Sequence, residues 1–409
     1  MRTRDVCFAS LLVLATAGVR GESVSPAPGP QQARNLNNVG SVYFGRGEYA
    51  RAESMFSQSA AMGEPEAVLN LAATLRAEGR YPEAEKMYQR ARPTGTALLG
   101  LALVNRDMGH YSEAEDFAHR ALEQGADAGS ALDLLGTVAE SEGRLEDAKV
   151  LLRRALASAE QPDTLINLGI AERRTGDLAA AQNHLERAVA LLKDAGDHGT
   201  RTAAALEALA LLDRARGDLK QARVVGTRGL LLLQASVGVD HPEYAAALSN
   251  LALISQDAHD VHRAMELFRQ ALRIDEEKLG PAHPRVGTDL NNLGVAAAEL
   301  HDYASSESYF RRALTVQSNT VTSAYWMANL ASLYVHEGKG AHAMALYRDA
   351  TRILRGTDSP GLRAAQTLEE YAVLLRKAGS YAEAESVETV AMRIRVRYAI
   401  TRTEAGNRT

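Results

Sequence analysis

The sequence is nearly devoid of cysteine, since a single residue of this type, Cys7, occurs among 409. One thiol excludes intrachain disulfides, zinc sites built from several thiolates and redox-active Cys-x-x-Cys pairs. Lysine is also scarce, because only seven of the 46 Lys and Arg residues are lysines, and the formal net charge is −5. So small a net charge predicts no general electrostatic attraction to nucleic acid or to anionic lipid.

Long apolar runs are absent too, apart from one short segment near the N-terminus. Residues 6–15 (VCFASLLVLA) are followed by the small-x-small cleavage pattern that ends at Ala17. The run is shorter than the ~20 residues that a membrane-spanning helix needs. This favours a cleavable signal peptide over residues 1–17 and an exported, periplasmic or extracellular protein without a membrane span in the mature chain. A membrane anchor formed by an uncleaved signal is the alternative.

The remainder consists of a Pro-rich stretch typical of a linker (residues 18–33), a repetitive region and a polar tail (residues 401–409). Each repeat has a small residue after a hydrophobic one, usually a Gly seven residues later, and an Ala five residues beyond that Gly. The first small residue recurs ten times, at Gly40, Ala72, Ala102, Gly136, Gly169, Ala210, Ala252, Gly294, Ala331 and Ala372. The second recurs at Ala52, Ala84, Ala114, Ala148, Ala181, Ala222, Ala264, Ser306, Ala343 and Ala384.

This spacing predicts ten pairs of antiparallel helices. The small residues allow two helices to approach closely, and the intervening turn residue is expected to adopt a left-handed conformation, which glycine tolerates best. In two repeats His259 and His301 occupy that turn position. Seven large residues are expected to fill the space between the helices: Phe56, Tyr88, Leu152, Leu185, Phe268, Phe310 and Tyr347. Three repeats depart from this pattern and predict loose or terminal packing, at Ala118, Gly226 and Glu388.

A small residue, a turn glycine, a second-helix alanine and a large residue four positions further on resemble the tetratricopeptide repeat. Five copies near the 34-residue family period occupy residues 34–192, and five longer copies of about 37–42 residues occupy 193–400. The longer copies resemble the 42-residue class of kinesin light chain, with Gly280 expected to cap a long second helix and Pro284 to begin the next helix. The change of period at Leu191–Arg201 suggests a joint between two sub-arrays. The resemblance implies an all-α, right-handed superhelical solenoid whose first helices line a concave groove.

Asparagine recurs two residues before the first small residue in six repeats: Asn38, Asn70, Asn167, Asn250, Asn292 and Asn329. Asparagine is a mediocre helix former, so such a row requires a cause. In the families that this chain resembles, asparagine at this position hydrogen-bonds the backbone of a peptide in the groove, as both donor and acceptor. The alternative is that each asparagine bonds a neighbouring helix and stiffens the stack.

Two further sets of residues are candidates for the same groove. Arginine recurs six residues after the asparagine position, at Arg76, Arg106, Arg173, Arg214 and Arg376. These guanidiniums would flank the groove and favour an acidic segment or a carboxyl terminus, unless they form a solvated polar face. Tyr325 lies four residues before Asn329 and could stack on a ligand side chain. Tyr325 and Trp326 are otherwise structural, with Trp326 packed against the preceding repeat.

No pattern of catalytic residues is present. The sequence contains no Gly-rich phosphate loop, no Gly-x-Ser-x-Gly and no His-Glu-x-x-His, and His259-x-x-His262 has no further ligand placed beside it. We therefore predict no metal, no cofactor and no enzymatic activity. The expected function is a scaffold that binds a protein or peptide segment. The alternatives are a structural subunit of an envelope assembly or, in the cytosol, a peptide-responsive regulator.

Overall fold

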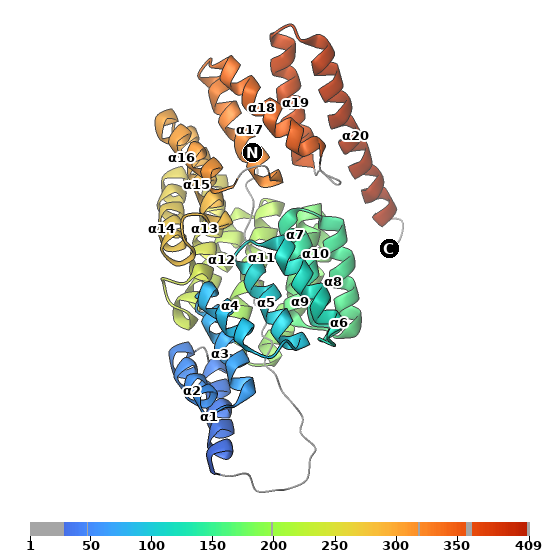
Figure 1. Cartoon of the computed structure of the whole chain (residues 1–409). Coiled ribbons are helices and arrows are strands. Elements are labelled where there is room, and N and C mark those ends of the chain that lie inside the picture. Colours follow the sequence, from blue (N-terminus) through green and yellow to red (C-terminus); the bar gives the residue numbers. More distant parts are fainter. Residues whose placement is uncertain (1–27, 47, 198, 318–319, 357–361, 407–409) are drawn as a thin grey trace. The chain divides into compact units, whose positions relative to one another are not determined.

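The computed structural model describes residues 28–46, 48–197, 199–317, 320–356 and 362–406 of the chain. Every regular element in these ranges is a helix, and the 20 helices follow one another as ten helix–turn–helix hairpins (Figure 1). The all-α fold of about ten hairpins predicted from the sequence is confirmed.

Each hairpin consists of a first helix and a second helix. The first helices are α1 (Pro28–Gly45), α3 (Pro65–Ala77), α5 (Gly95–Asp107), α7 (Ala128–Glu142), α9 (Pro162–Thr175), α11 (Thr200–Arg216), α13 (Pro242–Asp257), α15 (Pro284–Glu299), α17 (Val321–His336) and α19 (Leu362–Lys377). The second helices are α2 (Tyr49–Ala61), α4 (Tyr81–Arg90), α6 (Tyr111–Glu123), α8 (Leu145–Ser158), α10 (Leu178–Asp194), α12 (Leu219–Ser236), α14 (Val261–Leu279), α16 (Tyr303–Val316), α18 (Gly340–Arg355) and α20 (Tyr381–Gly406).

The hairpins form two compact units that divide within α14. The N-terminal unit contains the described part of residues 4–260 together with 273–280, and the C-terminal unit contains that of 261–272 and 281–409. The change of period at Leu191–Arg201 lies inside the N-terminal unit. One buried cluster, which includes Leu165, Leu185 and Leu212, continues across it from α9 through α10 to α11.

The helices extend beyond the repetitive region at both ends. The first helix begins at Pro28, within the segment predicted as a linker, because proline is tolerated in the first turn of a helix. The last helix continues to Gly406, into the predicted polar tail. The predicted signal peptide 1–17, with Cys7, lies outside the described residues.

The turn between the two helices of a hairpin has the predicted left-handed conformation. His259 and His301 both have φ of 61°, and they are the only described non-glycine residues with positive φ. The place of these two histidines in the repeat therefore predicted a strained, left-handed backbone conformation that their residue type alone would not suggest. The predicted turn glycines within the described residues also have positive φ: Gly79, Gly109, Gly143, Gly176, Gly217, Gly338 and Gly379. Gly47 lies outside the described residues.

Close packing of each hairpin depends on the small residue of its first helix. A Cβ added to Gly136 would lie 2.7 Å from Cγ of Leu152, and one added to Gly294 would lie 2.6 Å from Cε1 of Phe310. The predicted pairing of small with large residues is thus confirmed. The expectation of loose packing at Gly226 is wrong, because Leu251 of the next hairpin fills the space beside it, with Cδ2 2.9 Å from an added Cβ.

The longer repeats begin and end as the sequence predicts. Gly280 follows α14 with φ of 86°, and Pro284 is the first residue of α15. His241 and His283 precede α13 and α15, and Nδ1 of each accepts a hydrogen bond from the backbone N–H of the second residue of its helix. Nε2 of His241 also lies 2.5 Å from the carbonyl oxygen of Ala77. Within the N-terminal unit, the start of α13 therefore lies beside the end of α3.

Candidate functional site

The first helices form the inner face of each unit. Successive first helices, such as α5 with α7 and α15 with α17, contact one another directly, whereas successive second helices make no comparable contact among the described residues. A stack of hairpins curves toward the side on which its helices are closest. The predicted asparagine and arginine positions therefore belong to the side that curves inward.

The asparagines connect each first helix to the preceding one. In each of these contacts, which we call rungs, the asparagine Nδ2 donates to a side chain three residues before the small residue of the preceding first helix. The described rungs run from Asn70 to Asn37 (2.9 Å), Asn167 to Asp133 (3.1 and 3.2 Å), Asn250 to Glu207 (3.1 Å) and Asn329 to Asn291 (2.8 Å). The amide donors thus serve the stack, as the second interpretation of the asparagine row predicts. Their part in peptide binding stays a prediction.

Two members of the asparagine row lie outside this pattern. Asn38 is exposed on the first helix of the array, and its neighbour Asn37 is the residue that accepts the rung from Asn70. Asn292 is only 1% exposed, and its Oδ1 has no hydrogen-bond partner among the described residues. An acceptor buried in this way costs free energy unless a ligand or water reaches it.

The rung acceptors are buried polar positions that sequence reasoning missed. Two are amides, Asn37 and Asn291, and two are carboxylates, Asp133 and Glu207, all of them buried. Burial raises the pKa of Asp133 to about 6, although hydrogen bonds from Thr164 and Asn167 act in the opposite direction. A polar residue on an otherwise buried helix face, three residues before the small residue, is the signal that could have found them.

Three of the predicted arginines, Arg76, Arg106 and Arg214, reach in the opposite direction, toward the following repeat. Nε of Arg76 lies 2.6 Å from Asp107, and Nε of Arg214 lies 2.8 Å from Asp257. Arg106 bonds Asp107 on its own helix as well as Thr137 of the next. Burial alone would raise the pKa of Asp107, but the guanidiniums of Arg106 and Arg76 hold it below its usual value.

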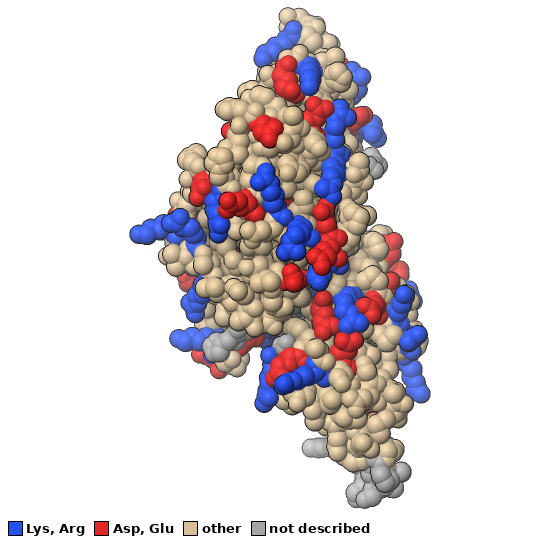
Figure 2. Space-filling model, turned by 90° about the vertical axis from the view of Figure 1, so that its left-hand side faces the viewer, with Lys and Arg blue, Asp and Glu red and all other residues tan. Residues whose placement is uncertain are grey.

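The last arginines of the row differ in their surroundings. Arg173 is buried in α9. Arg376 is exposed and makes two hydrogen bonds, of 2.8 and 2.6 Å, to Glu388 of its own hairpin. On the face displayed in Figure 2, Lys and Arg are interspersed with Asp and Glu. Most of the predicted arginines are therefore matched by acids of the chain itself.

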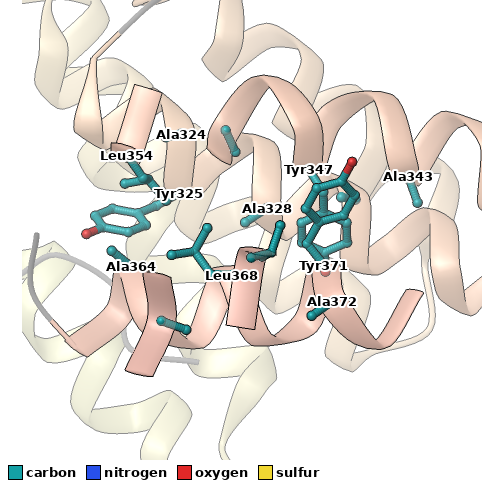
Figure 3. Close-up of a cluster of buried hydrophobic side chains, with 14 of the residues drawn as sticks. Ala324, Tyr325, Ala328, Ala343, Tyr347, Leu354, Ala364, Leu368, Tyr371 and Ala372 are labelled. Carbon is teal, nitrogen blue, oxygen red and sulfur yellow. The ribbon is translucent and has the colours of Figure 1, made fainter. Parts of the chain in front are cut away.

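The aromatic candidates lie in the core of the C-terminal unit. Tyr325 is largely buried beside Leu354, Ala364 and Leu368 (Figure 3). The guanidinium of Arg363 lies 4.5 Å from the ring centroid of Tyr325. Trp326 packs against the preceding repeat, as expected, because a Cβ added to Gly287 of α15 would collide with its ring. The structural role proposed for the pair therefore has direct support, and ligand stacking by Tyr325 stays a prediction.

Within the described ranges, no three His, Cys, Asp or Glu side chains are grouped so that they could hold a metal ion. In the same ranges, no helix combines the length and the apolarity needed to cross a membrane.

Comparison with known proteins agrees with this architecture. Family models described as tetratricopeptide repeat match residues 40–97, 160–235 and 243–319. A solved Rap protein complexed with Competence and Sporulation Factor matches 82% of this chain and 98% of its own, with a TM-score of 0.55 and 14% identity. A putative kinesin light chain of Podospora anserina, with nearly identical TPR-like repeats, matches 47% of this chain and 96% of its own, with a TM-score of 0.40 and 20% identity. No curated protein matches the sequence.

The family models together cover more than half of the residues, and the hairpins that they match have the small residues, turns and helix pairs described above. Repeats of this kind form scaffolds for protein interaction. The chain belongs to the tetratricopeptide-repeat family.

Proposed function

We propose that this protein is a non-catalytic scaffold that binds a peptide or an extended protein segment on the inner face of its first helices. The similar Rap protein was solved in complex with Competence and Sporulation Factor, which makes a bound partner of this kind a reasonable expectation for the present chain. The repeats themselves supply the surface, because stacked first helices place equivalent side chains at regular intervals.

The observation that carries the proposal is the buried carbonyl oxygen of Asn292. Its neighbour Asn291 is engaged by Asn329 in the rung between α15 and α17, while Oδ1 of Asn292 has no partner among the described residues. A backbone N–H of a bound peptide is the donor that would satisfy it. The inner face of α15 and α17 in the C-terminal unit is therefore the proposed binding surface.

The ion pairs favour recognition of the backbone of a peptide over recognition of its acidic groups. Arg76, Arg214 and Arg376 each contact a carboxylate of the chain at 2.6–2.8 Å. An acidic segment or a terminal carboxylate would have to displace these acids. We therefore expect the affinity to depend weakly on the acidity of the ligand.

The proposal can be tested with peptides selected against the full chain from a random displayed library. Isothermal titration should show that Asn292→Ala weakens binding of the selected peptides about tenfold, the effect of one lost hydrogen bond to a buried acceptor. Asn183→Ala is the matched control, because Asn183 is exposed on the second helix α10. Equal thermal midpoints of the three proteins would exclude unfolding. Selected peptides that bind all three equally would contradict the proposal.

We also propose that the protein is exported. The sequence of residues 1–17 supports this, through its short apolar run and the small residues around Ala17. N-terminal sequencing of the protein purified from its native cells should find a chain that begins near residue 18. A chain that retains Met1, recovered from the cytosol, would instead favour the peptide-responsive regulator.

A further inference from the structure

The two ends of the array expose apolar residues at positions where most interior repeats bury or half-bury them. On α1, Val39 and Val42 are 43% and 53% exposed, and on α20 Tyr381 and Met392 are 64% and 69% exposed. Terminal repeats of solenoids generally carry a polar outer face, which keeps the ends from associating. These ends keep the apolar residues of an interior repeat.

An interior interface shows what covers these positions elsewhere. Leu168 and Ala171 of α9 occupy the positions of Val39 and Val42, and both are buried against α8 of the preceding hairpin. Leu156 of α8 occupies the position of Met392 and packs into the same cluster. The start face of the chain, Val39 and Val42, and its end face, Tyr381 and Met392, are thus the two halves of one interface that recurs along the array.

The donor and acceptor positions of the rung contact also occur at the two ends of the array. Asn38 of the first repeat is at the donor position and is exposed. Glu369 of the last repeat is at the acceptor position, and its carboxylate is partly exposed while it pairs with Arg395 at 2.6 Å. Glutamate can serve there, because Glu207 accepts the rung from Asn250. One end therefore carries a donor and the other an acceptor for a contact that interior repeats make.

We propose that copies of this chain associate head to tail, with the end face of one copy seated on the start face of the next. Met392 of one copy covers Val39 and Val42 of the other, and Asn38 donates to Glu369 across the junction. The contact is heterologous, because each copy contributes two different surfaces. The occupant is a second copy, because each copy exposes one half of this recurring interface at its start and the matching half at its end.

Sedimentation of the full chain should show a mass that rises with protein concentration. Val42→Glu, which places a charge on the start face, and Met392→Glu, which places one on the end face, should each raise the dissociation constant at least tenfold. Val224→Glu is the matched control, because Val224 is 60% exposed on α12, which belongs to neither terminal hairpin, and it should associate like the unaltered chain. Circular dichroism should be the same for all four proteins, since each changed side chain is exposed.

Mixing the two end variants is the sharper test. Val42→Glu keeps an intact end face and Met392→Glu keeps an intact start face, so an equimolar mixture should form a dimer and nothing larger. A chain that stays monomeric at every concentration would overturn the proposal. Association that survives both substitutions, or variants that fail to form the mixed dimer, would overturn it equally, because the contact would then use other surfaces.

Discussion

The rung between α7 and α9 ends on a carboxylate, Asp133, whereas the rung between α15 and α17 ends on an amide, Asn291. The donors are equivalent asparagines, and the distances from Nδ2 to the acceptor oxygen are 3.1 and 2.8 Å. Geometry therefore requires only a side-chain oxygen at this position. The carboxylate adds a buried charge, and with it a dependence on pH that the amide rung lacks.

The largest expected effect comes from removing the donor of the carboxylate rung. Asn167→Ala deprives the buried Asp133 of a hydrogen bond and should lower the free energy of unfolding by about 3 kcal/mol at pH 8, because a buried charge loses a donor. Urea unfolding followed by circular dichroism measures this. Asn183→Ala serves as control, since Asn183 is exposed on α10 and makes no rung. A loss below about 1 kcal/mol would mean that the rung is not a stabilising contact.

The second prediction concerns the stability that the protein loses by burying the charge of Asp133. The pKa of Asp133 is raised in the folded protein from 3.8 to about 6. The folded state therefore binds more protons than the unfolded state between about pH 4 and 6, and stability falls as the pH rises through that window. Asp133→Asn copies the amide rung and should increase the free energy of unfolding by up to about 3 kcal/mol well above pH 6.

Below about pH 4 the same substitution should have little effect, because Asp133 is then protonated in both states. Urea titrations at pH 4 and pH 8 would separate the two cases. An equal change at both values would mean that the substituted amide acts through its packing and not through the loss of charge.

A smaller loss is expected at the amide rung. Asn329→Ala leaves Asn291 without its donor and should lower the free energy of unfolding by about 1 kcal/mol, the usual value for a neutral hydrogen bond. The loss should be the same at pH 5 and pH 8, whereas that of Asn167→Ala should shrink at pH 5. Hydrogen exchange within α15 and α17 would localise the effect, because repeats depend mainly on their neighbours. A loss that changes with pH would contradict the distinction between the two rungs.

The donor half of each rung could be predicted from the sequence, and the acceptor half could not. Asparagine stands out in a helix and recurs at one position, so its row is visible without a structure. The acceptors are of three residue types, at separations of 33, 34, 43 and 38 residues from their donors. No single period relates the two halves, because the repeat length changes along the chain.

Local geometry was more predictable than contacts between repeats. The turn conformation of His259 and His301 followed from register alone, since every hairpin needs a left-handed residue at that position. The packing at Gly226 did not, because the residue that fills the space, Leu251, belongs to the next hairpin. A sequence specifies the turn of one repeat directly, whereas a contact between repeats also depends on how the two are placed.

The smallest effect concerns another buried carboxylate, that of Glu172, which contacts His184 and Arg153 instead of an amide. Its side chain is fully buried, with Nδ1 of His184 at 2.7 Å and Nη2 of Arg153 at 3.1 Å. The hydrogen bond to Glu172 raises the pKa of His184, although partial burial acts in the opposite direction. Because the folded pKa is raised, the stabilisation is complete below about pH 6.5 and is lost as the pH rises through the folded value.

His184→Gln keeps a hydrogen-bonding side chain and removes this titration. Since His184 is partly exposed, we expect a loss below about 1 kcal/mol at pH 5.5 and almost none at pH 9. Urea unfolding of the two proteins at both pH values measures the difference. This window lies above that of Asp133, so the two contributions can be separated in one pH series. A loss at pH 9 equal to that at pH 5.5 would show that His184 supports Glu172 as a neutral ring, and the charged pair would then contribute nothing.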